Sequence, residues 1–229
     1  MRIERANYQI LTPISDNGQH ELKRLEICAR VCYKSEDKIT EDGESAKALV
    51  KRLIDSGHEA MLEHGTITVR FICDRAVSHE LVRHRMASFA QESQRYCNYS
   101  LDKFGRDITF ILPYWLDEED LGYSDWERSC REAEQTYFRL LDYGYSPQQA
   151  RMVLPNCTKT EIIVTANFRE WRHILKLRTA PDAHPDMQRL MRRLLTELKE
   201  RIPVLFDDIG YSIDKTKWQP SNKTIVTNS

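Results

Sequence analysis

Two segments of this chain have the character of long β-strands, and they constrain the fold more than any other feature. Residues Thr66–Cys73 (TITVRFIC) are rich in β-branched side chains and alternate along the chain, and Thr158–Ala166 is a second strong strand candidate. Such segments are typical of strands that bury one face. Strand and helix patterns do not alternate regularly around them. We therefore expect an α+β protein with a mostly antiparallel central sheet flanked by helices.

Helical periodicity and end signals predict the other elements. Asp74 is a good helix N-cap and Gly57 a plausible C-cap. Residues Met86–Ser100 are polar and poorly periodic, which predicts a loop. Short strands are expected at Asn7–Pro13, on a sheet edge, and at Asp107–Leu112. Helices are expected at His20–Tyr33, Ser45–Ser56, Arg75–Arg85, Ser124–Tyr143, Ser146 to about Val153, Phe168–Arg178 and Asp186–Ile202.

Length and composition are those of a soluble globular protein. The 229 residues suffice for one substantial core, which predicts a single domain over residues 1–229 with a polar tail from about Tyr211. No apolar run approaches the roughly 18 residues of a membrane span, and the N-terminus has no secretory pattern. We expect a cytoplasmic protein with no membrane partner. The net charge of −1 argues against broad nucleic-acid binding.

Glycine and cysteine usage limit how a ligand can be held. The eight glycines form neither GxGxxG nor GxxxxGK[ST], so Rossmann and P-loop phosphate sites are excluded. Side chains must then do the work of phosphate binding. The six cysteines include no CxxC pair, and we expect no metal site.

The segment Leu81–Tyr96 (LVRHRMASFAQESQRY) carries the most chemical information. Arg83, His84 and Arg85 fall at the predicted end of a helix, where positive charge also interacts favourably with the macrodipole. Consecutive helical residues point about 100° apart, so the three side chains fan out. Such a fan suits two ligands, or a ligand and a neighbouring subunit.

Three polar residues downstream alternate along the chain. In an extended loop Gln91, Ser93 and Arg95 would share one face. An amide, a hydroxyl and a guanidinium on one face suit a polar anionic ligand such as a nucleotide.

Arg83-His84-Arg85, seven further residues and then Ser93 resemble the RHR-x7-S signature of flavin-dependent thymidylate synthases. The similarity covers about residues 20–190. Further matching segments are Gly57-His58-Glu59 with Glu63-His64, Arg151 with Leu154-Pro155, and Thr165-Ala166-Asn167 through Arg178.

This resemblance implies the alternative thymidylate synthase fold and a homotetramer with FAD at subunit interfaces. Asn167 would cap a helix on which Arg169 and His173 share one face at i,i+4. The residues implied to contact FAD are Arg83, His84, Arg85, Asn167, Arg169 and His173, with Ser35, His58 and Glu63 near the flavin.

A dUMP site is implied in the same way. Arg95 and Arg151 are expected to bind the phosphate, because guanidinium–phosphate contacts are charge-assisted. Arg178 is the expected catalytic residue, stabilising negative charge on the pyrimidine. Gln91 stands where the family commonly has Glu, and Glu80 where it has Gln. The complete implied set is Glu80, Gln91, Ser93, Gln94 through its backbone, Arg95, Arg151 and Arg178.

The implied reaction methylates dUMP with methylenetetrahydrofolate, reduced FAD giving the hydride and NADPH re-reducing the flavin. Ser93 is interpreted as a phosphate or ribose ligand, with a nucleophilic role as the alternative, since no histidine base adjoins it in sequence. Two other functions remain open at this point. One is a nucleic-acid-binding protein that uses the Arg83–Arg95 stretch; the other is a flavoprotein of the same fold with another substrate.

Overall fold

A four-stranded antiparallel sheet lies at the centre of the computed structural model, which describes residues 1–96, 99 and 105–211. The expected α+β class is confirmed, and the tail predicted beyond Tyr211 lies outside the described residues. The sheet order is β2 (Asn7–Ile10), β3 (Thr66–Asp74), β6 (Lys159–Asn167) and β4 (Ser88–Gln91). A separate parallel pair joins β1 (Arg2–Glu4) to β5 (Thr109–Ile111).

The two long strands pair over their full length because their alternation matches. Ile67 and Val69 of β3 and Val164 of β6 are fully buried on one face. On the other face Thr68 lies opposite Thr165, and their hydroxyl oxygens are 2.9 Å apart. Burying one apolar face against helices is the main stabilising contribution of such a sheet.

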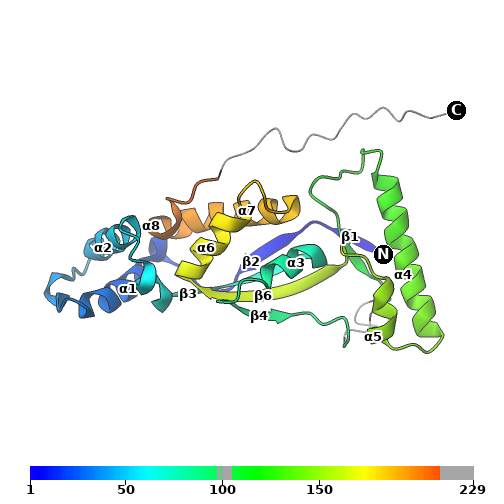
Figure 1. Ribbon diagram of the computed structural model, residues 1–229, viewed down its shortest axis with the longest axis horizontal. Helices are drawn as coiled ribbons and strands as arrows, with labels where there is room; N and C mark the ends of the chain where they lie inside the picture. Colours follow the sequence, from blue (N-terminus) through cyan, green and yellow to red (C-terminus); the bar gives the residue numbers. More distant parts are fainter. Residues whose placement is uncertain (97–98, 100–104, 212–229) are drawn as a thin grey trace.

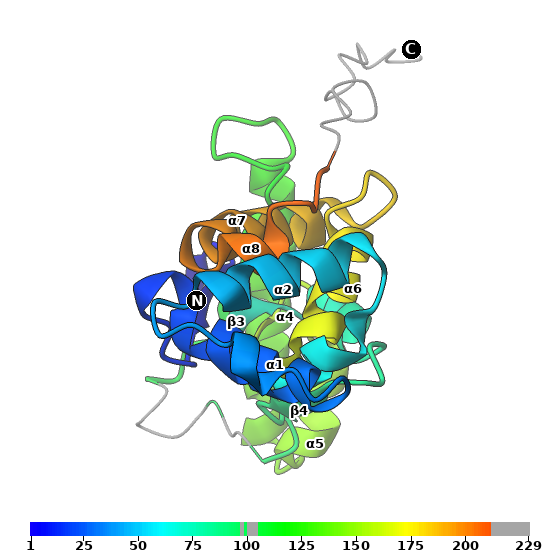
Figure 2. The ribbon, with the colours of Figure 1, turned by 90° about the vertical axis from the view of Figure 1, so that its left-hand side faces the viewer.

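Helices cover the apolar face and both ends of the sheet (Figure 1). In that view α6 and α7 lie above the strands, while α1 and α2 form a pair at one end and α4 stands at the other. Figure 2, seen from the α1–α2 end, shows α7 and α8 above that pair. The bounds are α1 Gln19–Val31, α2 Glu44–Asp55, α3 Arg75–Leu81, α4 Tyr123–Asp142, α5 Pro147–Ala150, α6 Phe168–Arg178, α7 Pro185–Arg201 and α8 Pro203–Phe206, with 3-10 turns η1 Asp16–Gly18, η2 Glu36–Lys38, η3 Glu59–His64 and η5 Arg151–Val153.

Helix α6 is fixed to the sheet by its first turns. The buried Trp171 donates its indole N–H to the carbonyl oxygen of Ile67 at 2.9 Å. Asn167 accepts a hydrogen bond from the backbone N–H of Glu170 at 2.8 Å, which confirms the expected cap. The exposed side of α6 is thereby oriented in a defined way. Among the described residues, no helix has both the length and the apolar character that crossing a membrane requires.

Two predictions around the Arg-His-Arg motif were wrong. Residues Ser88–Gln91, expected in a loop, form the edge strand β4 paired with Thr165–Ile162. This strand is too short for its period to be visible in the sequence. Helix α3, expected to run to Arg85, ends at Leu81 with Val82 as its C-cap. The chain then turns, so the three motif residues do not fan out from a helix.

Candidate active site

His84 is the buried centre of the Arg-His-Arg turn. Its backbone N–H donates to the carbonyl of Leu81 at 3.1 Å, and its own carbonyl accepts from Ala87 at 3.1 Å. The residue is only 5% exposed, whereas the flanking Arg83 and Arg85 are exposed. The turn therefore presents two guanidinium groups outward and anchors itself through the imidazole.

Three side chains of α6 surround this imidazole. Arg178 donates from Nε to Nε2 of His84 at 3.0 Å, and an oxygen of Glu170 lies 3.6 Å from Nδ1. The ring of His173 meets it edge-on, with centroids 5.9 Å apart. Burial, together with the charges of Arg178 and His173, lowers the pKa of His84 to about 4. His84 is therefore neutral at pH 7.

Arg178 is held at the same time by Glu80 at the end of α3. Its Nη1 donates to the Glu80 carboxylate at 2.6 Å, and its Nη2 donates to the Glu80 backbone carbonyl at 3.0 Å. The sequence predicted both residues at one nucleotide site, and the structure brings them together. The result is a fixed, partly buried cation, which is the arrangement that stabilises developing negative charge on a bound ring.

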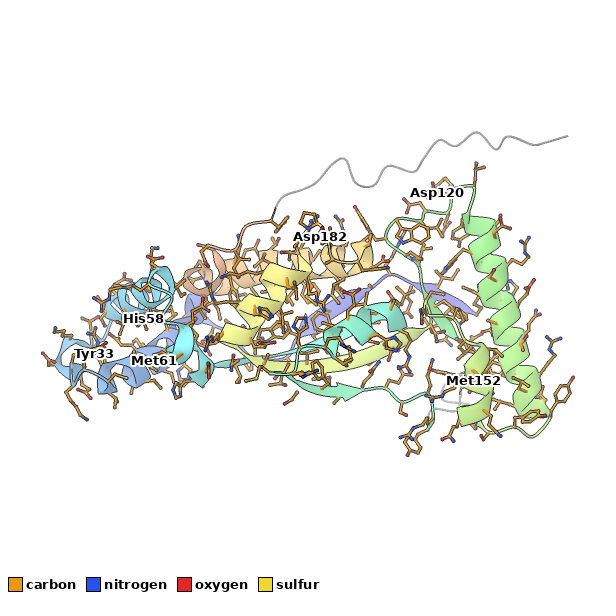
Figure 3. All side chains as sticks on the ribbon, viewed as in Figure 1. Tyr33, His58, Met61, Asp120, Met152 and Asp182 are labelled. Carbon is orange, nitrogen blue, oxygen red and sulfur yellow. The ribbon has the colours of Figure 1, made fainter. Side chains whose placement is uncertain are left out.

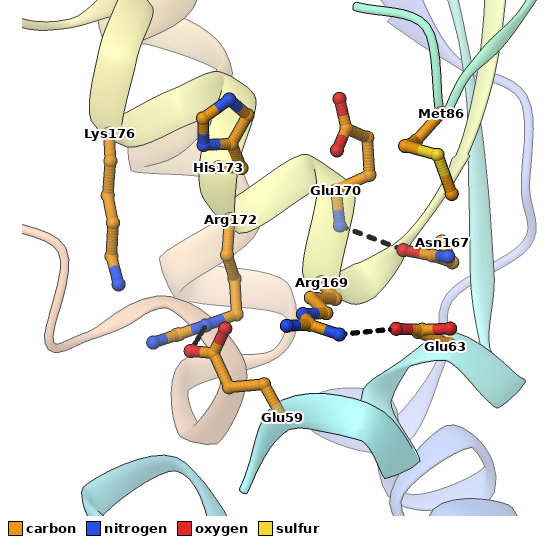
Figure 4. A pocket seen from close by; sticks show the side chains of 9 residues that line it. All are labelled: Glu59, Glu63, Met86, Asn167, Arg169, Glu170, Arg172, His173 and Lys176. Carbon is orange, nitrogen blue, oxygen red and sulfur yellow. Dashed lines mark hydrogen bonds and ion pairs between the residues drawn. The ribbon is translucent and has the colours of Figure 1, made fainter. Parts of the chain in front are cut away.

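A cavity of about 470 Å³ opens beside this cluster, along α6 (Figure 4). Arg169 pairs with Glu63 at 2.6 Å, and Arg172 donates to Glu59 at 3.1 Å. Glu63, Asn167, Arg169 and His173 were all predicted flavin residues. The lining residues are Glu59, Glu63, Met86, Asn167, Arg169, Glu170, Arg172, His173 and Lys176, of which Glu59, Met86, Glu170, Arg172 and Lys176 were not predicted.

Two further predicted flavin residues, Ser35 and His58, line a second cavity of about 480 Å³ between α1 and α2. Of the described residues that line it, three carry cationic side chains and none is a carboxylate. These cations are Arg30, Lys38 and Arg52. His58 lines this second cavity, and the next residue, Glu59 at the start of η3, lines the first. One short segment therefore borders both cavities.

The predicted nucleotide residues of β4 and its turn do not share one face. The side-chain amide of Gln91 donates to the hydroxyls of Ser78 and Thr160 at 3.0 and 3.2 Å. Beyond Ser93 the chain turns, with Ser93 Oγ accepting from the Arg95 N–H at 3.3 Å. The extended arrangement expected over these residues is therefore wrong after Ser93.

Arg95 and Gln94 differ strongly in exposure. The Arg95 guanidinium is exposed and lies 5.1 Å from the ring centroid of Tyr96. Gln94 is 9% exposed, and within the described part of the chain its side-chain amide nitrogen has no hydrogen-bond partner. The Gln94 side chain therefore faces the interior, and the contact of its backbone with a ligand stays a prediction.

Arg75 is a further candidate site residue, which the sequence-based prediction did not include. Its Nη2 donates to the carbonyl of Glu92 at 3.3 Å, while its Nε is buried without a hydrogen-bond partner among the described residues. Burial lowers the pKa of Arg75, and the charge of Arg151 acts in the same direction. A cation at the first position of a helix is unfavourable to the macrodipole, and that signal could have identified it.

Comparison with known proteins identifies the family. The family model described as thymidylate synthase complementing protein matches residues 14–204. A flavin-dependent thymidylate synthase of Corynebacterium aurimucosum is 36% identical over 210 residues, covering 84% of this chain and 82% of that protein. The chain belongs to the flavin-dependent thymidylate synthase family. The predicted enzyme class is thereby confirmed. A second flavin-dependent thymidylate synthase, from Geobacter sulfurreducens, is 34% identical over 189 residues and 80% of each chain.

A solved structure supports the same relationship. The crystal structure of the UMP/dUMP methylase PolB from Streptomyces cacaoi, bound with 5-Br dUMP, aligns with a TM-score of 0.72 at 25% identity. The alignment covers 90% of this chain and 96% of that one.

Within this chain, the predicted site residues are spread along the molecule. Figure 3 shows His58 at the α1–α2 end and Met152, next to Arg151, at the opposite end beside α5. Arg178, Glu80, His84 and His173 lie between them. A single protomer therefore brings only part of the predicted set together.

Proposed function

We propose that this chain converts dUMP to dTMP, with methylenetetrahydrofolate as carbon donor, reduced FAD as hydride source and NADPH as the reductant of the flavin. One observation carries the proposal: Arg178, fixed by Glu80 and His84, lies next to the α6 cavity, because His84 also contacts His173 and Glu170, which line that cavity. A nucleotide ring on Arg178 and a flavin in that cavity would be adjacent.

The residues around the α6 cavity fit a flavin with its pyrophosphate. Two of the three lining carboxylates are paired with arginines, Glu63 with Arg169 and Glu59 with Arg172. The exposed Arg83 and Arg85 precede Met86, which lines the cavity. We propose that these two arginines and Arg169 hold the pyrophosphate, because guanidinium groups bind phosphate oxygens through two N–H groups at once.

The nucleotide would be held at two points. We propose that its phosphate meets Arg151, Arg95 and the newly identified Arg75. The pyrimidine would lie at Arg178, whose charge would stabilise an anionic form of the ring, and in that form carbon 5 is nucleophilic enough to attack the folate methylene. The carbon arrives as a methylene group and leaves as a methyl group, so each turnover needs one hydride, which reduced flavin supplies when bound.

Ser93 is proposed as a phosphate or ribose ligand. Its hydroxyl accepts a hydrogen bond from the backbone of Arg95, which fixes the turn. A serine nucleophile needs an adjacent base that takes its proton, and no histidine base adjoins Ser93 in sequence.

A homotetramer with sites at its interfaces accounts for the apolar residues exposed around the site. Large apolar side chains adjoin Arg83, Arg85, Arg95, Arg151 and Arg178 in the chain. They are Val82 (40% exposed), Met86 (70%), Tyr96 (78%), Met152 (80%) and Leu177 (47%). Clusters of exposed apolar residues mark interaction surfaces. A subunit interface there would also join the residues that one protomer keeps apart.

Tritium release from [5-³H]dUMP tests the function directly. With FAD, methylenetetrahydrofolate and NADPH present, we expect tritium in water and dTMP by mass spectrometry. Omitting the folate is the matched control and must abolish dTMP. Release without dTMP, or reduction of another substrate only, would identify a flavoprotein with a different reaction.

A further inference from the structure

The hydrogen bond between Arg178 and His84 shows where the imidazole carries its proton. Every N–H of a guanidinium is a donor, and none is an acceptor. Because Arg178 Nε donates to His84 Nε2 at 3.0 Å, Nε2 must offer its lone pair. A neutral imidazole then carries its proton on Nδ1, and a protonated one could not accept this bond at all.

The Nδ1 edge of the ring faces Glu170. An oxygen of its carboxylate lies 3.6 Å from Nδ1, in a region where the Glu170 side chain is 11% exposed and that of His84 4%. This separation is longer than a hydrogen bond. Since His84 is neutral, the contact joins a carboxylate to an N–H dipole. In poorly hydrated surroundings such a contact orients the ring strongly.

The other charged or titratable groups around His84 do not supply this acceptor. Arg178 donates from the opposite edge, and His173 meets the ring edge-on. Glu80, on α3, is engaged by two nitrogens of Arg178. Glu170 is therefore the carboxylate that faces Nδ1.

We propose that Glu170 is a positioning residue for Arg178: its carboxylate fixes the Nδ1–H tautomer and the ring orientation of His84, whose Nε2 then holds the guanidinium together with Glu80. This inference rests on the proposed function of Arg178 at the nucleotide. It assigns to Glu170 a role that neither the motif nor the spacing of the sequence indicated.

The contacts with His84 and Glu80 determine which N–H groups of Arg178 remain for a ligand. A guanidinium has five N–H groups. His84 takes the one on Nε, and Glu80 takes one on each Nη. One N–H on each Nη then remains without a partner among the described residues and is available to a ligand. If the imidazole adopted the other tautomer, its Nε2–H would oppose the Nε–H of Arg178, and the guanidinium would lose one of its anchors.

Two substitutions and one spectroscopic measurement test the proposal. Glu170→Ala removes the acceptor, while Glu170→Gln keeps a neutral carbonyl oxygen in its place. We expect E170A to lower kcat about tenfold to hundredfold, as for a misoriented catalytic group, with E170Q restoring most of the loss. Glu132→Ala, an exposed glutamate of α4, is the matched control. Flavin absorbance is measured in each variant, because Glu170 also borders the α6 cavity.

Nitrogen NMR of ¹⁵N-histidine-labelled protein reads the tautomer without any turnover, with His84→Gln to assign the signals. We expect Nδ1–H in the wild type and in E170Q, and a mixture of tautomers in E170A. An unchanged tautomer or an unchanged kcat in E170A overturns the proposal, as does E170Q being as slow as E170A. Loss of flavin in E170A with a normal tautomer would instead make Glu170 a cofactor contact. If the wild type forms no dTMP while the tautomers behave as expected, the proposed function fails and the His84–Glu170 contact stands.

Discussion

The guanidinium of Arg172 binds both carboxylate oxygens of Asp208, at 2.6 and 2.7 Å, and so joins α6 to the segment that follows α8. Arg172 is 1% exposed and also donates to Glu59 and to the carbonyl of Leu205. A buried cation of this kind depends on its partners, because an uncompensated charge in the interior is strongly unfavourable.

Replacing Asp208 with Asn should therefore destabilise the fold. The Asp208 side chain is 41% exposed, so solvent screens part of the interaction and we expect a loss of about 1–2 kcal/mol in the free energy of unfolding at pH 7. Asp207→Asn, at the exposed neighbouring position, is the control. Urea denaturation followed by circular dichroism measures both. Equal stability of the two variants would contradict the structural role of the pair.

The same pair predicts a pH dependence. Its hydrogen bonds with Arg172 lower the pKa of Asp208 in the folded state below its unfolded value. A group with a depressed folded pKa stabilises the fold above its unfolded pKa, near 4 for an aspartate, and that contribution is lost as pH falls through the folded value. The stability difference between wild type and D208N should shrink below about pH 4. A difference that persists at lower pH would rule out titration of Asp208 as its source.

A neighbouring side chain, and not the backbone conformation, requires a glycine at position 65. The backbone of Gly65 is extended, a conformation open to any residue. A Cβ there would lie 2.0 Å from a ring carbon of Phe168, the buried first residue of α6. We expect Gly65→Ala to lower stability by about 1–3 kcal/mol through overpacking and to weaken flavin binding by shifting Arg169. Gly210→Ala, where nothing lies within 4 Å, is the control. Thermal denaturation and flavin absorbance report the two effects.

Arg83 and Arg85 should bind the flavin without supporting the subunit fold, because both are exposed. We expect Arg83→Ala or Arg85→Ala to weaken FAD binding about tenfold to hundredfold, the loss of one charge-assisted contact, with the far-ultraviolet circular dichroism unchanged. Arg128→Ala on α4 is the control for removing an exposed arginine. Unchanged flavin absorbance in the motif variants would mean that the cofactor lies elsewhere.

Ser93→Ala distinguishes the two roles considered for this residue. A ligand role predicts that the Kd for dUMP rises about tenfold while turnover at saturating dUMP is largely retained, since one hydrogen bond to a charged group is lost. Calorimetric titration and steady-state kinetics measure the two quantities. Intact affinity with abolished turnover would establish the nucleophile instead.

The long helices and strands were predictable because their apolar residues recur with a regular period over many positions. Strands β3 and β6 and helix α6 follow their alternation or period closely, and the cap of α6 by Asn167 was expected from its residue type. Strand β4 was missed because four residues at a sheet edge have little periodicity of their own. It forms because β6 offers an unpaired edge, which is information held by the partner strand.

The site was less predictable than the sheet, for a physical reason. The chain turns after Leu81 because the buried His84 contacts Arg178 and Glu170. These contacts join residues that are far apart in the chain. Local helical propensity predicted a longer helix, and tertiary contacts overrode it. Glu170 was not expected for the same reason: its role depends on which histidine it faces.

Arg75 provides the last prediction, because it should recognise the phosphate of the nucleotide and nothing else. Its partly buried guanidinium lies near Arg151, and its Nε has no hydrogen-bond partner in the described part of the chain, so an anion placed between the two would relieve their repulsion. We expect Arg75→Met to raise the Kd for dUMP about tenfold, while the affinity for deoxyuridine, which lacks the phosphate, stays unchanged. His79→Ala, exposed on the same helix, is the control, and competition calorimetry compares the ligands. An equal loss of affinity for both ligands would show that Arg75 supports the turn around Glu92 rather than the phosphate.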